Sequence, residues 1–204
     1  MSWNDEQLDL MEALCCKVRV LSEGQIVRGW SQPTVNETVS TLIQADMLHS
    51  ERWSVVLPLI GGSPSVIWRP SQPCPDTWML SQHFRGRWNR QLASTTVFMA
   101  TERAGRLFGS RSGHQIREFE RSHDLLLAEV YLLYRKRLPQ LAAAWVGEDS
   151  LPIAQRGIKN PDAFLFDDSH IPRRVIESAG SYSQKQVETF HRYCATARIP
   201  YELW

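Results

Sequence analysis

The spacing of hydrophobic and polar positions predicts helices in the first part of the chain. Residues 5–20 carry an apolar stripe at helical spacing, which indicates an amphipathic helix. Ser22 is a typical N-cap for a short second helix. A third helix is expected from Gln32 to residue 48, because Pro33 suits the first turn and apolar residues recur on one face.

Two apolar runs that follow these helices predict a β-hairpin. Residues 53–60 and 65–70 flank the turn sequence Gly61-Gly62-Ser63-Pro64, although Pro58 makes the first run irregular. Three helices followed by a hairpin are typical of a winged helix-turn-helix. We therefore expect such a domain over residues 1–75.

The last third of the chain predicts a small mixed sheet with helices. Residues 116–138 have the longest helical pattern, and residues 141–146 indicate a first strand. Two further apolar runs, 160–166 and 173–180, precede an amphipathic helix and a final short strand over 199–204. The fold class is therefore α+β.

Two carboxylates lie at the ends of the predicted strands 160–166 and 173–180. Asp162 opens one predicted strand and Glu177 closes the next, so a hairpin around residues 167–172 would place them side by side. Neighbouring carboxylates repel each other unless a cation neutralises them, and hard oxygen ligands suit Mg²⁺. We therefore expect Asp162 and Glu177 to be ligands of a metal ion, and such an ion can polarise a phosphate and activate water.

The order Pro161-Asp162, about fifteen residues, then Glu177 and an amphipathic helix resembles the PD-(D/E)XK nuclease superfamily. The winged-helix pattern, the Thr101 to Gly105 helix and the helix led by His123 resemble the replication-relaxation family of mobile-element proteins. The resemblance implies a restriction-endonuclease-like α/β core over residues 116–204. It also implies a DNA-binding role.

The resemblance also implies a catalytic lysine two residues after the glutamate, where this chain has Ala179. Lys185, early in the following helix, is the candidate replacement, so Asp162, Glu177 and Lys185 are the predicted catalytic residues. Glu129 is either a third metal ligand or a structural glutamate. Tyr182 either reaches back towards Glu177 or packs, and His123 is either a functional histidine or a capping or core residue.

The polar face of the third helix is the predicted reader of DNA bases, with Asn36, Thr41 and Gln44 among its outward residues. These side chains can bond to base edges, but none of them is basic. Residues 1–80 have a net charge of −4, which disfavours phosphate contacts. The alternative for this domain is dimerisation or protein docking.

Basic residues concentrate in the middle of the chain. The net charge of the whole chain is +1, but residues 81–117 contain seven arginines and one acid, a net charge of +6. We treat residues 76–115 as a basic connecting segment. Arg85, Arg87 and Arg90 alternate there with aromatic residues, as expected of a nucleic-acid surface. The alternative is that the aromatic residues pack in the core and the arginines are solvated.

Several classes of protein are disfavoured by the sequence. The four cysteines lack the spacing of a zinc site, and no apolar run is as long as a membrane span. There is no secretory signal and no phosphate-binding glycine motif, so we expect a cytoplasmic protein without a nucleotide cofactor.

The function that we expect is DNA binding in the replication, relaxation or transfer of a mobile element such as a plasmid. Because the lysine is missing, the nuclease-like core is expected to be weak or inactive. A Mg²⁺-dependent DNA endonuclease is the first alternative. A protein-interaction or transcription-regulatory module is the second, and a homodimer through residues 5–20 would favour it.

Overall fold

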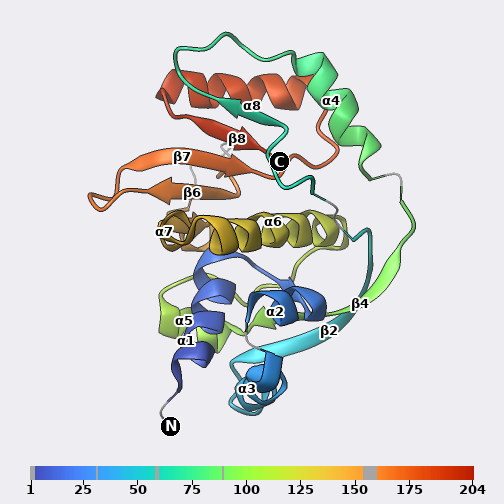
Figure 1. The fold of residues 1–204 in the computed structure, drawn as a ribbon, viewed down its shortest axis with the longest axis vertical. Helices are drawn as coiled ribbons and strands as arrows, with labels where there is room; N and C mark the ends of the chain where they lie inside the picture. The colour runs from blue at the N-terminus through green and yellow to red at the C-terminus, as the bar shows by residue number, and fades with distance from the viewer. Residues whose placement is uncertain (1–2, 31, 58–59, 89, 154–159) are drawn as a thin grey trace.

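The computed structural model of the chain describes residues 3–30, 32–57, 60–88, 90–153 and 160–204 (Figure 1). The fold is a mixed α+β arrangement with two small sheets. This confirms the predicted fold class at that level. Among the described residues, no helix combines the length and apolar character needed to cross a bilayer.

The first sheet is antiparallel and belongs to the N-terminal half. Its strands lie in the order β1-β4-β2, and eight consecutive residues of β2 pair with β4. The elements of this half are α1 (Asp5–Glu12), the π-helical turn η1 (Ala13–Lys17), β1 (Leu21–Ser22), α2 (Glu23–Gly29), α3 (Gln32–Gln44), β2 (Leu48–Val55), β4 (Ala93–Ala100) and α5 (Glu102–Phe108).

The second sheet gathers strands from distant parts of the chain. Its order is β3-β8-β7-β6-β5, and only the β7–β8 pair is parallel. The sheet is therefore small and mixed, as the sequence predicts. Its strands are β3 (Val66–Trp68), β5 (Trp145–Gly147), β6 (Ala163–Phe166), β7 (Pro172–Glu177) and β8 (Tyr201–Leu203).

The predicted hairpin between residues 53–60 and 65–70 is wrong. Strand β2 pairs with β4, whereas β3 pairs with β8 at the other end of the chain. The pairing buries a large aromatic surface, because Trp68 of β3 stacks on Tyr201 of β8 with ring centroids 5.3 Å apart. Residues 58 and 59, in the first predicted hairpin strand, lie outside the described residues.

The predicted helix starts are confirmed by their caps. Ser22, Thr101 and Ser183 each accept a hydrogen bond from a backbone N–H in the first turn of their helix. The remaining helices are α4 (Thr77–Gly86), α6 (Glu118–Arg137), α7 (Pro139–Ala143), the 3₁₀ turn η2 (Glu148–Ser150) and α8 (Gln184–Ala197).

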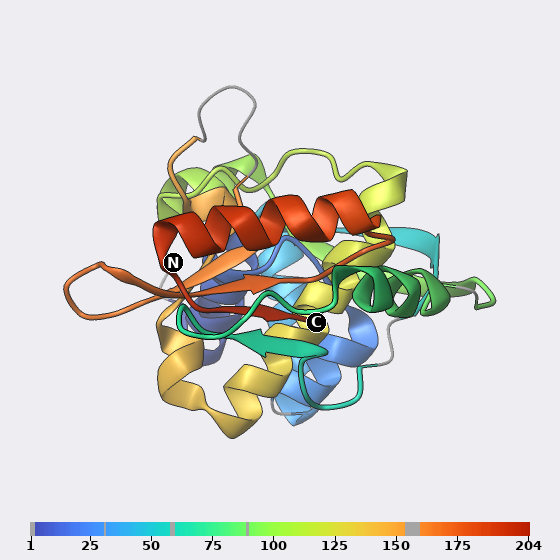
Figure 2. The same ribbon diagram turned by 90° about the horizontal axis from the view of Figure 1, so that it is seen from above.

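Helix α6 lies between the two halves of the molecule (Figure 1). One continuous apolar core joins it to α1, α2 and the inner face of the second sheet, where Ile176 points. Val175, the preceding residue, belongs to a second core under α8, as expected when successive side chains alternate across a strand. Helix α8 therefore lies over the outer face of this sheet, with α4 beside it (Figure 2).

The chain crosses three times between the two sheets, from β2 to β3, from β3 to β4 and from β4 to β5. β3 falls in the predicted domain 1–75 but joins the second sheet, and β4 falls in the predicted connecting segment 76–115 but is the central strand of the first sheet. The two halves also approach closely at Gly147, where an added Cβ would lie 2.3 Å from the carbonyl oxygen of Lys17. The sheets are thus joined by both strand exchange and close packing.

Candidate functional site

The two predicted acids lie side by side at the end of a hairpin. Strands β6 and β7 pair antiparallel with Ala163 opposite Ile176, so the next residues outward are Asp162 and Glu177. Both side chains are buried, with 2% exposure each, and the backbone N–H of Asp162 donates to Glu177 Oε2 at 3.1 Å. The structure therefore confirms that the hairpin brings this pair together.

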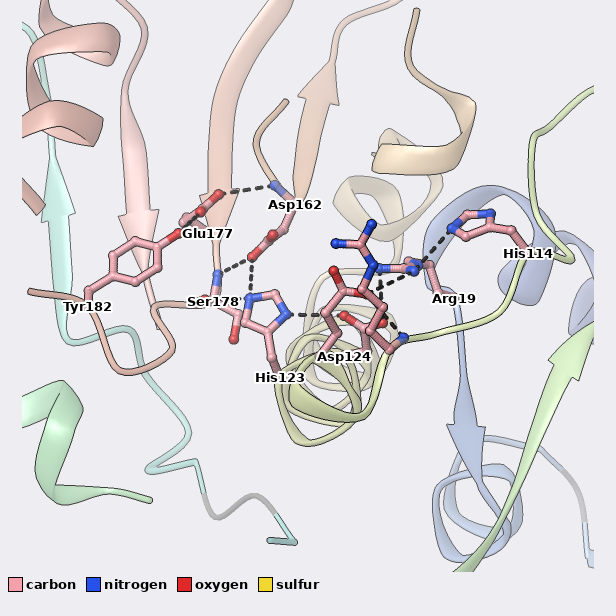
Figure 3. A network of polar contacts seen from close by, with 10 residues as sticks. Arg19, His114, His123, Asp124, Asp162, Glu177, Ser178 and Tyr182 are labelled. Carbon is pink, nitrogen blue, oxygen red and sulfur yellow. Dashed lines mark hydrogen bonds and ion pairs between the residues drawn. The ribbon is translucent and has the colours of Figure 1, made fainter. Parts of the chain in front are cut away.

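His123 of α6 adds a positive charge to the acids (Figure 3). Its Nε2 lies 3.1 Å from Asp162 Oδ2 and 2.8 Å from the carbonyl oxygen of Ser178, and its Nδ1 lies 3.1 Å from Asp124 Oδ1. Burial disfavours the charged ring, but the Asp162 and Asp124 carboxylates outweigh it and raise the pKa of His123 well above 6.5. His123 is therefore an imidazolium at neutral pH.

The charge network continues from His123 to the N-terminal half. Asp124 Oδ2 pairs with Arg19 Nη1 at 3.2 Å, and Arg19 Nη2 lies 3.1 Å from His114 Nε2 (Figure 3). Burial of Arg19 opposes its charge, yet the negative charge of Asp124 leads the effects that raise the pKa of the guanidinium. From Asp162 through His123 and Asp124 to Arg19, acids and bases alternate, so their charges compensate one another.

Tyr182 covers the second acid. Its hydroxyl donates to Glu177 Oε1, which confirms the first of the two alternatives for this residue (Figure 3). Burial, followed by the charge of Glu177, raises the pKa of the Tyr182 hydroxyl, so the phenol stays protonated and keeps donating. Glu177 is therefore fixed from one side by Tyr182 and from the other by the backbone of Asp162.

A cleft of about 840 Å³ opens next to this network. Asp162, His123 and Tyr182 line one part of it, and the basic side chains of Arg111, His114 and Arg117 line another, together with Arg19. Further acids also line the cleft, namely Glu120, Asp124, Glu148 and Asp149. The cleft therefore has a mixed lining in which acidic and basic side chains balance.

The acid pair, as arranged, does not fit a divalent metal ion. Asp162 Oδ2 accepts the N–H of Ser178 at 2.7 Å and faces the His123 cation, and the two oxygens of Glu177 accept bonds from Tyr182 and Asp162. A divalent ion would have to displace a bound imidazolium of the same sign. Among the described residues, no group of three or more His, Cys, Asp or Glu side chains is arranged to hold a metal ion.

The structure separates the candidate lysine from the His123 network. Lys185 is exposed in the first turn of α8. It does not line the cleft beside His123, but a second hollow that Glu177 and Tyr182 also line. At the lysine position of the family pattern, Ala179 is completely buried and its N–H donates to the carbonyl oxygen of Trp204 at 3.1 Å. Residue 179 therefore holds Trp204 in place through this hydrogen bond, rather than contributing a side chain to the acid pair.

The three candidate arginines do not form a single surface. Arg87 and Arg90 line a groove of about 730 Å³, whereas Arg85 lines a separate hollow of about 620 Å³ beside α8. The guanidinium of Arg87 lies 4.8 Å from the ring centroid of Phe84, and burial lowers its pKa. Phe84 is completely buried, so one of the aromatic residues does belong to the core, as the alternative predicts.

The candidate base-reading residues lie on the outer side of α3. Asn36 and Gln44 are exposed and Thr41 is half-buried, whereas Val39 and Leu42 face the core. Helix α3 lies at the end of the molecule away from α8 (Figure 1). The predicted base-reading residues and the acid pair thus occupy separate regions of the protein.

The sequence analysis missed the partners of His123. Asp124, Arg19 and His114 come from two separate segments, and no spacing rule connects them before the chain is folded. Asp124 could have been found, because it directly precedes the apolar run Leu125–Leu127 on a predicted helix, where a buried acid needs a partner. Glu129, the candidate third ligand, instead pairs with Arg28 of α2 at 2.6 Å and is a structural glutamate.

A comparison of the chain with protein-family models, with curated proteins and with solved structures found no match.

Proposed function

We propose that the protein binds double-stranded DNA through α3 and the two-stranded ribbon β2–β4. The observation that supports this most directly is the order α1, β1, α2, α3, β2 and, after the inserted β3 and α4, β4, with the strands paired as β1-β4-β2. This is the order of a winged helix-turn-helix in which β2 and β4 form the wing. The second helix of a helix-turn-helix lies in the major groove and contacts base edges.

The exposed side of α3 has the chemistry for base contacts. Asn36, Ser40 and Gln44 recur every four residues and are all exposed. Amide side chains pair with adenine edges, and hydroxyls bond to any base. The helix lacks basic residues, so the attraction to phosphates comes from elsewhere in the molecule.

The phosphate contacts that we propose are Arg87 and Arg90, beyond the far end of the ribbon. Eight residues of β2 span roughly 26 Å, so α3 and these arginines can face successive parts of one duplex. In the described chain, neither arginine forms an ion pair with a carboxylate, and both line the same groove. Phosphates would supply the missing negative charge.

The C-terminal half serves in this proposal as a nuclease-like core that does not cleave. His123 already neutralises Asp162, and Tyr182 already bonds to Glu177. The resemblance to replication-relaxation proteins adds the expectation that the bound duplex belongs to a mobile element. The acid pair then stabilises the fold rather than a metal-bound phosphate.

Duplex binding is tested by fluorescence anisotropy with a labelled duplex of mixed sequence over a range of salt concentrations. We expect affinity to fall steeply as salt rises. Arg90→Ala is expected to reduce the slope of log K against log salt by about 0.9, the value for one phosphate contact. Arg106→Ala is the matched control, because Arg106 is exposed and pairs with Glu102 on α5, and its slope should equal that of the wild type.

The reader helix is tested separately with the Asn36→Ala/Gln44→Ala variant. We expect this variant to lose discrimination among duplex sequences, at roughly 1 to 3 kcal/mol per lost base contact, while its salt slope is unchanged. Absence of binding at low salt, or equal binding by all these variants, would refute the proposal.

A further inference from the structure

Helix α8 borders an aromatic hollow that the proposed duplex contacts do not use. The hollow has a volume of about 490 Å³, within the ~300–1,000 Å³ of small-molecule sites. Tyr182, Phe190 and Tyr193 supply aromatic surface, and Asn160 and Gln186 supply amide groups. Tyr193 is 40% exposed, so its ring is available to a ligand.

A second hollow on α8 is basic. It has a volume of about 620 Å³ and is lined by Arg85, Lys185 and Arg192. None of these three cations forms an ion pair with a carboxylate of the described chain. Glu188 also lines the hollow, but its carboxylate accepts bonds from Gln184 and Thr77. The hollow therefore has a net positive charge.

The two hollows are continuous along one face of the helix. Ser183, Lys185 and Thr189 line both of them, and Lys185 and Thr189 are one helical turn apart on the exposed side of α8. Figure 2 shows α8 lying openly across the top of the molecule, with the end of α4, which contributes Arg85, nearby. An aromatic hollow and a basic hollow thus lie next to each other on one side of α8.

We propose that this surface of α8 binds a single strand of DNA, with a base stacked on Tyr193 and phosphates held by Lys185, Arg192 and Arg85. Aromatic rings beside a basic groove are the usual means of binding a single strand without sequence preference. The bases of an intact duplex are stacked on their neighbours and cannot enter a hollow. This inference rests on the proposed DNA-binding function and gives it a second site, for strands that have been separated.

The amide groups explain why a base, rather than any apolar group, suits the hollow. Asn160 Nδ2 already donates to the carbonyl oxygen of Pro152, and Gln186 Oε1 already accepts bonds from Ser183. Asn160 Oδ1 and Gln186 Nε2 are therefore the acceptor and the donor that can bond to the edge of a stacked base. The α3 contacts, at the other end of the molecule (Figure 1), and the Arg87–Arg90 groove play no part in this site. The two binding activities can therefore be lost independently.

The test is anisotropy of a labelled oligothymidylate of about twelve nucleotides, with EDTA present, in the range of known single-strand site sizes. The full-length protein should bind it. Tyr193→Ala is expected to weaken binding about tenfold, in line with the loss of one stacked base. Lys185→Ala/Arg192→Ala is expected to lower the salt slope by about 1.4, for two single-strand phosphate contacts.

Phe119→Ala is the control for the aromatic change, because Phe119 is 76% exposed on α6 and lies outside both hollows. Circular dichroism of each variant checks that the fold is retained. Anisotropy of a labelled duplex, measured in parallel, separates single-strand binding on α8 from duplex binding through α3. Both α8 variants should bind the duplex as tightly as the wild type does. An oligouridylate arm tests for RNA, and tighter binding of that strand would overturn the choice of DNA.

The single-strand site is refuted if the oligothymidylate does not bind while the duplex does. It is also refuted if Tyr193→Ala and Phe119→Ala bind it equally well. Displacement of the oligothymidylate by polyglutamate as readily as by unlabelled strand would show a general anion surface instead. Absence of duplex binding by the wild-type protein would refute the proposed function, whether or not the oligothymidylate binds.

Discussion

His123 determines the electrostatics of the acid cluster at the scale of single residues. Its imidazole lies 3.1 Å from both Asp162 and Asp124, which are 2% and 3% exposed. Buried charges are costly unless they are paired, and here one ring pairs with two carboxylates. We therefore interpret His123 as the internal counter-ion of the cluster.

The contribution of His123 to stability should depend on pH. Because the folded-state pKa is raised above the ordinary value of 6.5, the stabilisation is fully present below that value and is lost as pH rises through the folded-state pKa. We expect His123→Gln to lower the free energy of unfolding by roughly 3 kcal/mol at pH 6, as when a buried pair is broken. The loss should be smaller at pH 9 in urea denaturation.

The control for this prediction is His49→Gln, because His49 has 42% side-chain exposure and lies on the first sheet. It should change the free energy of unfolding little at either pH. An equal loss for His123→Gln at pH 6 and pH 9 would show that the ring acts by packing and hydrogen bonding alone.

At the scale of elements, the residues at the end of β7 are buried and hydrogen-bonded to the end of β8. Ala179 is completely buried and donates its N–H to Trp204, and the N–H of Trp204 donates to the Glu177 carbonyl. This reciprocal pair extends the parallel ladder between β7 and β8. A lysine at residue 179 would put a charge into this packed position, so the packing disfavours the lysine that the PD-(D/E)XK sequence pattern has there.

We expect no Mg²⁺-dependent nicking of supercoiled plasmid, because the acid pair is already neutralised by His123 and bonded to Tyr182. Gel electrophoresis of plasmid incubated with the protein and Mg²⁺ measures this. Asp162→Asn and Asp168→Asn are the matched variants, since Asp168 is exposed in the hairpin turn. Nicking that Asp162→Asn abolishes and Asp168→Asn retains would show that the core is catalytic.

At the scale of the whole molecule, the two sheets are interdependent. The first sheet needs β4, which follows β3 in the chain, and the second sheet needs β3, which precedes β4. Helix α6 contributes to the core on both sides. A cut anywhere between residues 69 and 92 therefore separates a strand from its sheet.

We expect a fragment of residues 1–75 to be unfolded, because it lacks both β4 and α6. A fragment of residues 1–138 has both elements and a complete first sheet, and should unfold cooperatively. Far-ultraviolet circular dichroism and thermal unfolding of the two fragments test this. Cooperative unfolding of residues 1–75 alone would show that the predicted N-terminal domain is independent after all.

The sequence by itself determined several helix starts and the acid pair. It did not determine every element, because the strand predicted over residues 141–146 is wrong: helix α7 occupies Pro139–Ala143 and β5 begins at Trp145. Helical spacing and the caps Ser22, Thr101 and Ser183 fixed where helices begin, since these depend on residues within one or two turns. The hairpin that joins Asp162 to Glu177 was predictable because its strands are close in sequence and its turn residues are polar.

Only the tertiary structure decided which distant segments meet. The pairing of β3 with β8 and of β2 with β4 depends on how aromatic and apolar faces are buried together, and periodicity does not identify a partner strand. In the same way, His123, Asp124 and Arg19 form a network only after α6 is packed between the sheets. The sequence could place two carboxylates together, but long-range packing decided that an imidazolium neutralises them.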